Sequence, residues 1–320
     1  MKRLLLILAC FFWQFALGQG RKIIVAADGT GDFKTVQQAL DAVKDSSATP
    51  TTIFIKKGIY KEKLRLQASK IKVTMIGEDR DRTILTYDDY HERKDSTGKA
   101  IGTSGSASFF IYANNFTALN LTFQNTAGIS AGQAVAVWVG GDRNRFKNCR
   151  FLGFQDTLYT FGAGLREYFE DCYIEGTVDF IFGAAIAWFE RCNIHLIRSG
   201  YVTAASTPQN VPYGYIFNKC RITGNAEEQS FYLGRPWRPY AAVTYLNCFL
   251  DKQIKSEGWD NWHNAANEKT ARFAEYNSKG PGASAAARVS WSRQLTDDEA
   301  KAYNVKNILS GADGWQPAAF

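Results

Sequence analysis

Six residues at positions 146–151 read F-K-N-C-R-F, and close copies of them return further along the chain. Each copy has an aromatic residue three positions before a cysteine and an apolar residue two positions after it. The copies are F-E-D-C-Y-I at 169–174, F-E-R-C-N-I at 189–194, F-N-K-C-R-I at 217–222 and Y-L-N-C-F-L at 245–250. Residues 121–123 read as an earlier copy with leucine in the cysteine position. Repeats of about 20 to 28 residues with short β-type runs indicate stacked structural units.

These repeats predict an all-β protein of the parallel β-helix type, with one turn of the coil per repeat. Each repeat contains several strand-length runs and lacks the periodicity of a helix. The cysteine and the apolar residue two positions later point the same way, into the coil. Because successive coils stack about 4.8 Å apart, the five cysteines should form an interior ladder, packing as small hydrophobic side chains. Metal binding is a weaker interpretation, since the chain has no Cys-x-x-Cys pair and only three histidines.

We expect short helices to cover the two ends of the coil, whose edges need closing. Residues 35–43 form an amphipathic pattern, which follows a predicted strand at 21–27 and precedes others at 52–55 and 72–76. At the other end, T-D-D-E at 296–299 is a capping box that predicts a helix extending to about Leu309.

The start of the chain, at 1–18, has the features of a cleavable signal peptide. Lys2 and Arg3 precede an apolar run at 4–17, and A-L-G at 16–18 predicts cleavage before Gln19. The run of about 14 apolar residues is shorter than the roughly 20 that span a membrane. We therefore expect a signal peptide at 1–18, a single domain at 19–320, and a secreted or periplasmic protein.

The charge of the chain favours an anionic partner. The net charge is +7, and removal of Lys2 and Arg3 with the signal peptide would leave +5. There is no basic run and no nucleic-acid-binding motif, so the sequence does not predict nucleic-acid binding. An anionic polysaccharide suits this charge, and we expect a monomer that does not associate with membranes.

Two aspartates occupy equivalent positions in neighbouring repeats. Asp156 lies in G-F-Q-D-T-L-Y at 153–159, Asp179 in G-T-V-D-F-I-F-G at 176–183, and each comes seven residues after a cysteine. An ionised carboxylate in such apolar surroundings is costly unless it is paired or functional. If the repeats stack, the two backbones lie about 5 Å apart. Gln133 precedes Asp156 by the same spacing that separates Asp156 from Asp179, so it is expected next in the same column, and Gln155 adjoins Asp156.

This group of side chains suits acyl transfer. Two close carboxylates do not both ionise cheaply, so one becomes an acid and the other a base or nucleophile. Neighbouring amides can donate hydrogen bonds to an oxyanion. The competing interpretation is a structural polar ladder within a turn. The spacing alone leaves the two aspartates equivalent. Tyr159, Phe180 and Phe182 are expected nearby.

Three other features are interpreted more simply. G-I-S-A-G at 128–132 matches the serine nucleophile elbow, but a predicted strand follows it where the elbow needs a helix. In L-G-R-P-W at 233–237, Arg235 could pair with a carboxylate and Trp237 could stack on a sugar ring. Trp259 and Trp262 are interpreted as packing residues. The polar segment 91–99 has no assigned role.

At four motifs the sequence resembles the pectin methylesterases, which are esterases built on a right-handed, single-stranded parallel β-helix. The resemblance runs from about Asp28 to Trp315, through G-Q-A-V-A (132–136), Q-D-T-L-Y (155–159), G-T-V-D-F-I-F-G (176–183) and L-G-R-P-W (233–237). The start of the chain, without a long pro-region before Asp28, looks more like the bacterial members than many plant ones.

The resemblance implies a pectinesterase that removes methyl esters from homogalacturonan without a metal or other cofactor. It implies the nucleophile at Asp179, the general acid and later base at Asp156, and the oxyanion-stabilising amides at Gln133 and Gln155. It also implies that Arg235 holds the nucleophile and that Trp237 stacks on the substrate. The candidate substrate-binding residues are Arg235, Trp237, Gln133, Tyr159 and Phe180. Two alternatives stay open: a pectate lyase or polygalacturonase on the same architecture, and a non-catalytic polysaccharide-binding coil.

We predict five free thiols in the mature protein, because neighbouring parallel strands rarely offer the Cβ geometry of a disulfide. The measurement is a thiol titration of the denatured, unreduced protein. Fewer than four thiols would overturn the predicted interior ladder.

Overall fold

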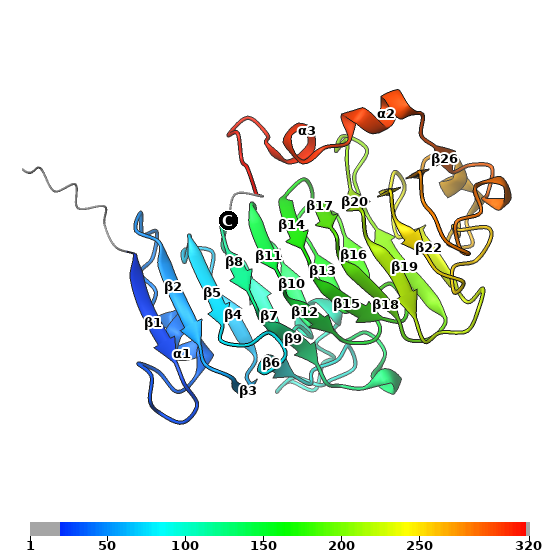
Figure 1. Cartoon of the computed structure of the whole chain (residues 1–320). Helices are drawn as coiled ribbons and strands as arrows, with labels where there is room; N and C mark the ends of the chain where they lie inside the picture. The colour runs from blue at the N-terminus through cyan, green and yellow to red at the C-terminus, as the bar shows by residue number, and fades with distance from the viewer. Residues whose placement is uncertain (1–19, 318–320) are drawn as a thin grey trace, which may run out of the picture.

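The computed structural model describes residues 20–317, which wind into a parallel β-helix with three long sheets (Figure 1). The strands of each sheet pair in parallel with the strands one coil before and one coil after them. The fold class predicted from the repeats is thus confirmed.

We refer to the three sheets as A, B and C. Sheet A contains β1 (Arg21–Val25), β2 (Thr51–Ile55), β5 (Val73–Gly77), β8 (Thr117–Leu119), β11 (Asn144–Lys147), β14 (Arg166–Glu170), β17 (Ile186–Glu190), β20 (Tyr215–Asn218), β23 (Ala242–Leu246), β25 (Arg272–Tyr276) and β26 (Arg293–Gln294). Sheet B contains β3 (Gly58–Lys61), β6 (Thr83–Tyr87), β9 (Thr122–Asn125), β12 (Arg150–Leu152), β15 (Tyr173–Gly176), β18 (Asn193–Leu196), β21 (Arg221–Gly224) and β24 (Phe249–Leu250). Sheet C contains β4 (Leu64–Leu66), β7 (Phe109–Ile111), β10 (Val137–Val139), β13 (Leu158–Thr160), β16 (Ile181–Gly183), β19 (Gly200–Ala205) and β22 (Phe231–Pro236).

The repeat seen in the sequence is one coil of the structure. Its aromatic residues lie opposite one another in sheet A and stack in a column, with ring centroids 4.5 to 4.8 Å apart. The column consists of Phe146, Phe169, Phe189, Phe217 and Tyr245. The five cysteines are buried and free, in agreement with the predicted interior ladder. Each thiol lies 3.3 to 3.5 Å from a backbone carbonyl oxygen of the preceding coil.

The turn before each cysteine uses the left-handed backbone region. Asn148 has φ 50° and Asn247 has φ 53°, values that asparagine tolerates better than most residues. Their side-chain amides bond to the asparagines of adjacent coils, Asn148 to Asn120 at 2.8 Å and Asn277 to Asn247 at 3.0 Å. These bonds connect the turns along the coil axis.

The helices cover one end of the coil and one of its sides. Helix α1 (Val36–Asp41) contacts β1 and β4 and buries Val36, Ala39 and Leu40 in the interior core, as predicted for an end cap. At the other terminus the capping box at Thr296 is present. The prediction of a single helix from this capping box to about Leu309 is wrong, because the chain forms two helices, α2 (Asp297–Ala302) and α3 (Val305–Leu309).

These C-terminal helices do not close the end of the coil, contrary to the prediction. They lie along the outer face of sheet A, where Ile308 and Leu309 pack with Tyr168 and Trp188 (Figure 1). The outer face of sheet A carries apolar side chains that need a cover, so burial of this surface explains their position. Short 3₁₀ turns complete the structure at η1 (Thr103–Gly105), η2 (Ile129–Ala131), η3 (Ala265–Lys269) and η4 (Ala285–Ala287).

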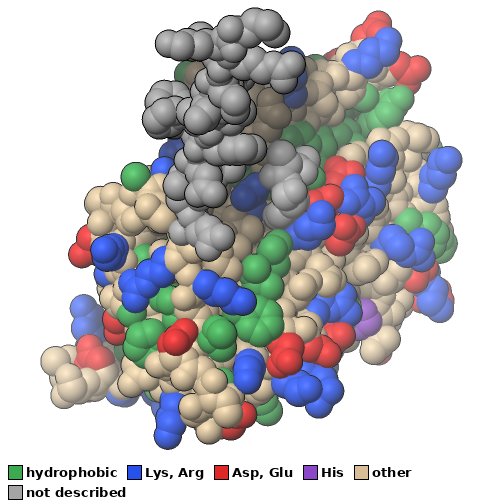
Figure 2. Space-filling model, turned by 60° about the vertical axis from the view of Figure 1, so that its left-hand side comes forward, with side chains coloured by type: hydrophobic (Ala, Val, Ile, Leu, Met, Phe, Trp, Pro, Cys, Tyr) green, Lys and Arg blue, Asp and Glu red, His purple; other side chains and the backbone are tan. Residues whose placement is uncertain are grey.

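Figure 2 shows Lys and Arg side chains mixed with Asp and Glu over one face of the molecule. The positive net charge is therefore not gathered into one continuous basic patch on that face.

One carboxylate lies inside the coil. Glu167 pairs in register with Asn144 in sheet A and is fully buried. Neither of its carboxylate oxygens has a hydrogen-bond partner among residues 20–317. Burial raises the pKa of Glu167 well above its ordinary value, and the nearby charge of Asp142 raises it further.

We predict that Glu167→Gln stabilises the protein at neutral and alkaline pH. A raised pKa in the folded state means that the wild type loses stability as pH increases above the ordinary carboxyl pKa of 4.5. Thermal unfolding at pH 4 and pH 8 measures the effect, with a higher Tm for the variant expected only at pH 8. Glu227→Gln, at an exposed position, is the control. A variant no more stable than wild type at pH 8 would contradict this assignment.

Candidate active site

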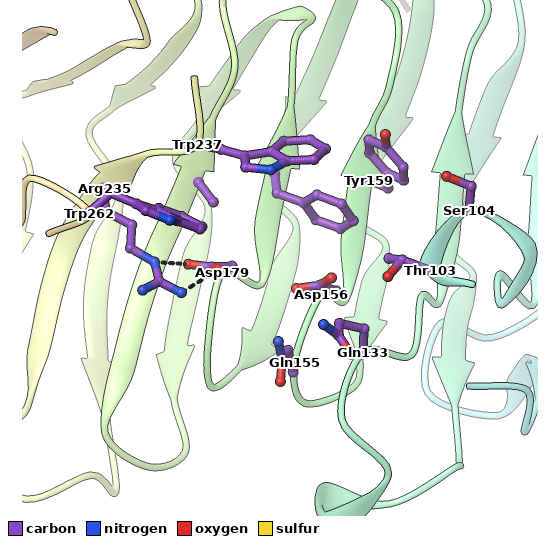
Figure 3. Close-up of a pocket in the computed structure, with 12 residues that line it drawn as sticks. Thr103, Ser104, Gln133, Gln155, Asp156, Tyr159, Asp179, Arg235, Trp237 and Trp262 are labelled. Atoms are coloured by element: carbon purple, nitrogen blue, oxygen red, sulfur yellow. Dashed lines mark hydrogen bonds and ion pairs between the residues drawn. The ribbon is translucent and has the colours of Figure 1, made fainter. Parts of the chain in front are cut away.

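A cleft of about 290 Å³ lies on the outer face of sheet C (Figure 3). It combines carboxylates, amides, hydroxyls, one arginine and several aromatic rings. Its lining residues are Thr103, Ser104, Gln133, Gln155, Asp156, Tyr159, Asp179, Phe182, Ala204, Arg235, Trp237 and Trp262.

The two aspartates occupy the same position on adjacent coils, as the repeat predicts. Asp156 comes two residues before β13 and Asp179 two residues before β16, and these strands pair with Leu158 opposite Ile181. Both aspartates have left-handed backbones, with φ 65° at Asp156 and φ 53° at Asp179. Such conformations are costly for residues other than glycine and are maintained by the surrounding structure. The N–H of Asp156 donates to the carbonyl of Val178 at 3.1 Å.

Gln133 lies beside Gln155, not in the column of Asp156 as predicted. The structure pairs Gln133 with Gln155 in an isolated parallel bridge. The spacing between these two residues is shorter than the spacing from Cys149 to Cys172, on which the prediction rests. The coil that contains Gln133 is therefore shorter than the cysteine repeat implies. Both amides still line the cleft together with Asp156.

Arg235, in β22, pairs with Asp179 through two parallel hydrogen bonds. Its Nε lies 2.9 Å and its Nη2 2.7 Å from the two carboxylate oxygens (Figure 3). The side chains are 15% and 9% exposed, so the pair is largely withdrawn from solvent. Bidentate pairs of this kind orient a carboxylate as well as neutralise it.

The two aspartates therefore have different electrostatic environments. Burial raises the pKa of Asp156 well above the ordinary value, and the charge of Asp179 raises it further. No side chain hydrogen-bonds to Asp156 within the described part of the chain. Burial also raises the pKa of Asp179, but the hydrogen bonds and charge of Arg235 lower it, so the pKa of Asp179 is raised less than that of Asp156. The arginine thus favours ionisation of Asp179 and leaves Asp156 as the better proton carrier.

Aromatic rings cover the floor and one side of the cleft. Tyr159 and Phe182 stack with centroids 4.1 Å apart, and Trp237 meets Tyr159 edge-on at 6.2 Å. Phe180 was predicted to bind substrate, but it is fully buried in the interior core and does not line the cleft. Successive side chains of a strand normally point alternately into and out of the coil. The left-handed turn at Asp179 interrupts this alternation, so Phe180 and Ile181 both face inward and Phe182 faces outward.

Four residues of the cleft were not predicted from the sequence, namely Thr103, Ser104, Ala204 and Trp262. Trp262 was interpreted as packing, yet it lines the cleft; Trp259 is buried and stacks on Phe273, as expected of a packing residue. Thr103 and Ser104 come from a loop at 88–105 that contains the unassigned segment 91–99. These residues lie outside the cysteine repeat, so no spacing identified them.

The loop at 88–105 is attached to the site through His91. Its backbone N–H donates to the carbonyl of Gln133 at 2.9 Å, and its ring nitrogen Nδ1 hydrogen-bonds with the hydroxyl of Thr103 at 3.0 Å. The loop therefore places Thr103 beside Gln133.

The competing serine site is not formed. Ser130 is exposed in the short turn η2, and the next regular element is the strand β10 instead of a helix. Among residues 20–317 there is no cluster of three potential metal-ligating side chains.

A parallel β-helix with paired carboxylates, two amides and aromatic rings in one open cleft defines a class of carbohydrate-directed hydrolase. Comparison with known proteins narrows this class. The family model described as Pectinesterase matches residues 22–312. Pectinesterase 31 of Arabidopsis thaliana is 42% identical over 287 residues, which cover 88% of this chain and 89% of that protein. The chain belongs to the pectinesterase family and is a carboxylic ester hydrolase that removes methyl esters from pectin.

Solved structures agree with this family. Pectin methylesterase from carrot has a TM-score of 0.84 at 33% identity, covering 92% of this chain and 94% of that one. A pectin methylesterase in complex with a hexasaccharide has a TM-score of 0.83 at 31% identity, covering 94% of this chain and 100% of that one. The expected likeness to bacterial members is not supported, since the relative at 42% identity is a plant protein. The family also excludes the lyase, polygalacturonase and non-catalytic alternatives.

Proposed function

We propose that this pectinesterase hydrolyses methyl esters with Asp179 as the nucleophile and Asp156 as the acid and then the base. The observation that carries the proposal is the unequal pairing of the two carboxylates. Arg235 forms a bidentate pair with Asp179 alone, which favours the ionised state of this group. Asp156 is buried without a hydrogen-bonding side chain, which favours its protonated state.

In the first half-reaction the Asp179 carboxylate attacks the ester carbonyl carbon of a methylated galacturonate unit. The carbonyl π electrons move to oxygen, and the amides of Gln133 and Gln155 donate hydrogen bonds to this oxyanion. When the tetrahedral intermediate collapses, the bond to the methoxy oxygen breaks. Asp156 donates its proton to that oxygen, so methanol leaves and an acyl-enzyme anhydride remains.

In the second half-reaction the ionised Asp156 accepts a proton from water as the water oxygen attacks the acyl carbon. The bond to Asp179 breaks, which releases galacturonic acid and restores both aspartates to their starting states; the acid then loses its proton to solvent and becomes the carboxylate. These steps use side chains of the cleft throughout and require no cofactor.

The aromatic part of the cleft is the proposed binding surface for the polysaccharide. Tyr159 and Trp237 offer apolar surface to sugar rings, and Arg235 offers positive charge to neighbouring carboxylates. The hexasaccharide complex of a relative supports binding of an extended oligosaccharide. The positive net charge of the chain agrees with a polyanionic product.

We further propose that the protein is exported and acts as a monomer. The predicted signal peptide at 1–18 lies outside the described residues. Within residues 20–317, none of the helices has the length and apolar character needed to cross a bilayer.

The first test of the proposal is methanol release from highly methylated pectin. We expect activity in the wild type with or without a chelator. Asp179→Asn should lower kcat by a factor of about 10⁴ or more. Its far-UV circular dichroism spectrum, which reports secondary structure, should be unchanged. Asp298→Asn, at an exposed position on α2, is the matched control and should keep full activity. Retained activity in Asp179→Asn would falsify the nucleophile assignment.

A second test is the pH dependence of kcat/KM. Activity should decrease at low pH as Asp179 is protonated, and at high pH as Asp156 loses its proton, which gives a bell-shaped profile. Arg235→Gln removes the hydrogen bonds that lower the pKa of Asp179, so the acid limb should move to higher pH. An acid limb that is unchanged in Arg235→Gln would show that another group titrates there.

A further inference from the structure

Two aromatic rings enclose the guanidinium group of Arg235. The ring of Tyr201 lies 3.8 Å from the central guanidinium carbon, and the ring of Trp262 lies at the same distance. Figure 3 shows the Trp262 ring beside the Arg235 side chain, next to the bonds to Asp179. Both distances are well within the range of cation–π contacts.

The structure holds each ring in place without help from a substrate. Tyr201 in β19 pairs in register with Tyr232 in β22, and their rings stack at 5.4 Å with an angle of 9° between planes. Trp262 lies in the loop after β24, with a left-handed backbone at φ 60°. Its backbone N–H donates to the carboxylate of Asp260 at 2.7 Å. The backbone N–H of Asp260 in turn donates to the carbonyl of Gly234, the residue before Arg235, at 3.2 Å.

The two rings restrict the arginine to one orientation. With both faces of the guanidinium covered, only its edge remains for hydrogen bonding, and that edge meets Asp179 through Nε and Nη2. An arginine has many rotamers, so without the rings the bidentate geometry would have to compete with solvated alternatives.

We propose that Tyr201 and Trp262 are positioning residues, which hold the Arg235 guanidinium against the Asp179 carboxylate and so keep Asp179 ionised for attack. This proposal rests on the nucleophilic role proposed for Asp179. The other charged or titratable groups around this pair are Asp156 on the adjacent coil, Asp260 in the loop and the phenol of Tyr201 itself. Asp156 carries no charge in its protonated state, whereas the charge of Asp260 opposes ionisation of Asp179, so Arg235 is the group that must be held in place.

The test compares Trp262→Leu, Tyr201→Leu and the double variant by the pH profile of methanol release. In each single variant the acid limb of kcat/KM should move to higher pH by about half a unit to one unit, and further in the double variant. At the low pH values of the acid limb, the decrease in kcat should exceed any change in KM. Trp262→Phe keeps an aromatic face and should restore most of the wild-type profile.

Trp138→Leu is the matched control. Trp138 belongs to the same aromatic surface and packs on Tyr112 and Phe161, each at 4.8 Å, rather than on Arg235. Its loss should change KM and leave the acid limb in place.

If both single variants keep the wild-type acid limb, or if Trp138→Leu shifts it equally, the positioning role is wrong. That outcome is distinct from failure of the proposed function, which would appear as activity in Asp179→Asn. Because the variants change two separate elements, misfolding of one still leaves the other as a test.

Discussion

The parallel pairing of successive coils is the constraint on which the site depends. Backbone hydrogen bonds hold strands of adjacent coils about 4.8 Å apart, so side chains in equivalent positions become neighbours whatever their chemistry. In the interior this produces columns of stacked phenylalanines and a row of buried thiols, which pack well. At the outer edge of sheet C it brings together two carboxylates, which repel each other. Backbone pairing, and not attraction between side chains, maintains that arrangement.

Arg235 makes the two carboxylates different. It comes from β22, which is two coils beyond β16, and reaches back to Asp179 across the intervening strand β19. Its charge offsets the burial of Asp179 but is too far along the stack to pair with Asp156. The division between a nucleophile and a proton carrier therefore arises from position along the coil axis. A buried ion pair stabilises a protein only weakly, so its geometry is better explained by function than by stability.

Loops outside the repeat complete the cleft. The loop at 88–105 brings Thr103 and Ser104 to one side, and the loop after β24 brings Trp262 to the other. Both are attached through backbone groups, to Gln133 in the first case and to Gly234 in the second. Rigid coils thus supply the reacting side chains, and the attached loops supply the surfaces that surround them.

The sequence by itself determined the coil, the interior cysteine ladder and the adjacency of Asp156 and Asp179, because a regular repeat and strict parallel pairing convert spacing into distance. The spacing of residues along the chain predicted side-chain positions wrongly where the coil is irregular. The coil at Gln133 is shorter than its neighbours, which moved this amide beside Gln155, and the left-handed turn at Asp179 moved Phe180 into the core. The repeat left the two aspartates equivalent, and only the family resemblance assigned Arg235 to Asp179. Only the tertiary structure decided where the C-terminal helices lie and that Trp262 covers Arg235. Those contacts join residues from different coils and loops, and no periodicity along the chain encodes them.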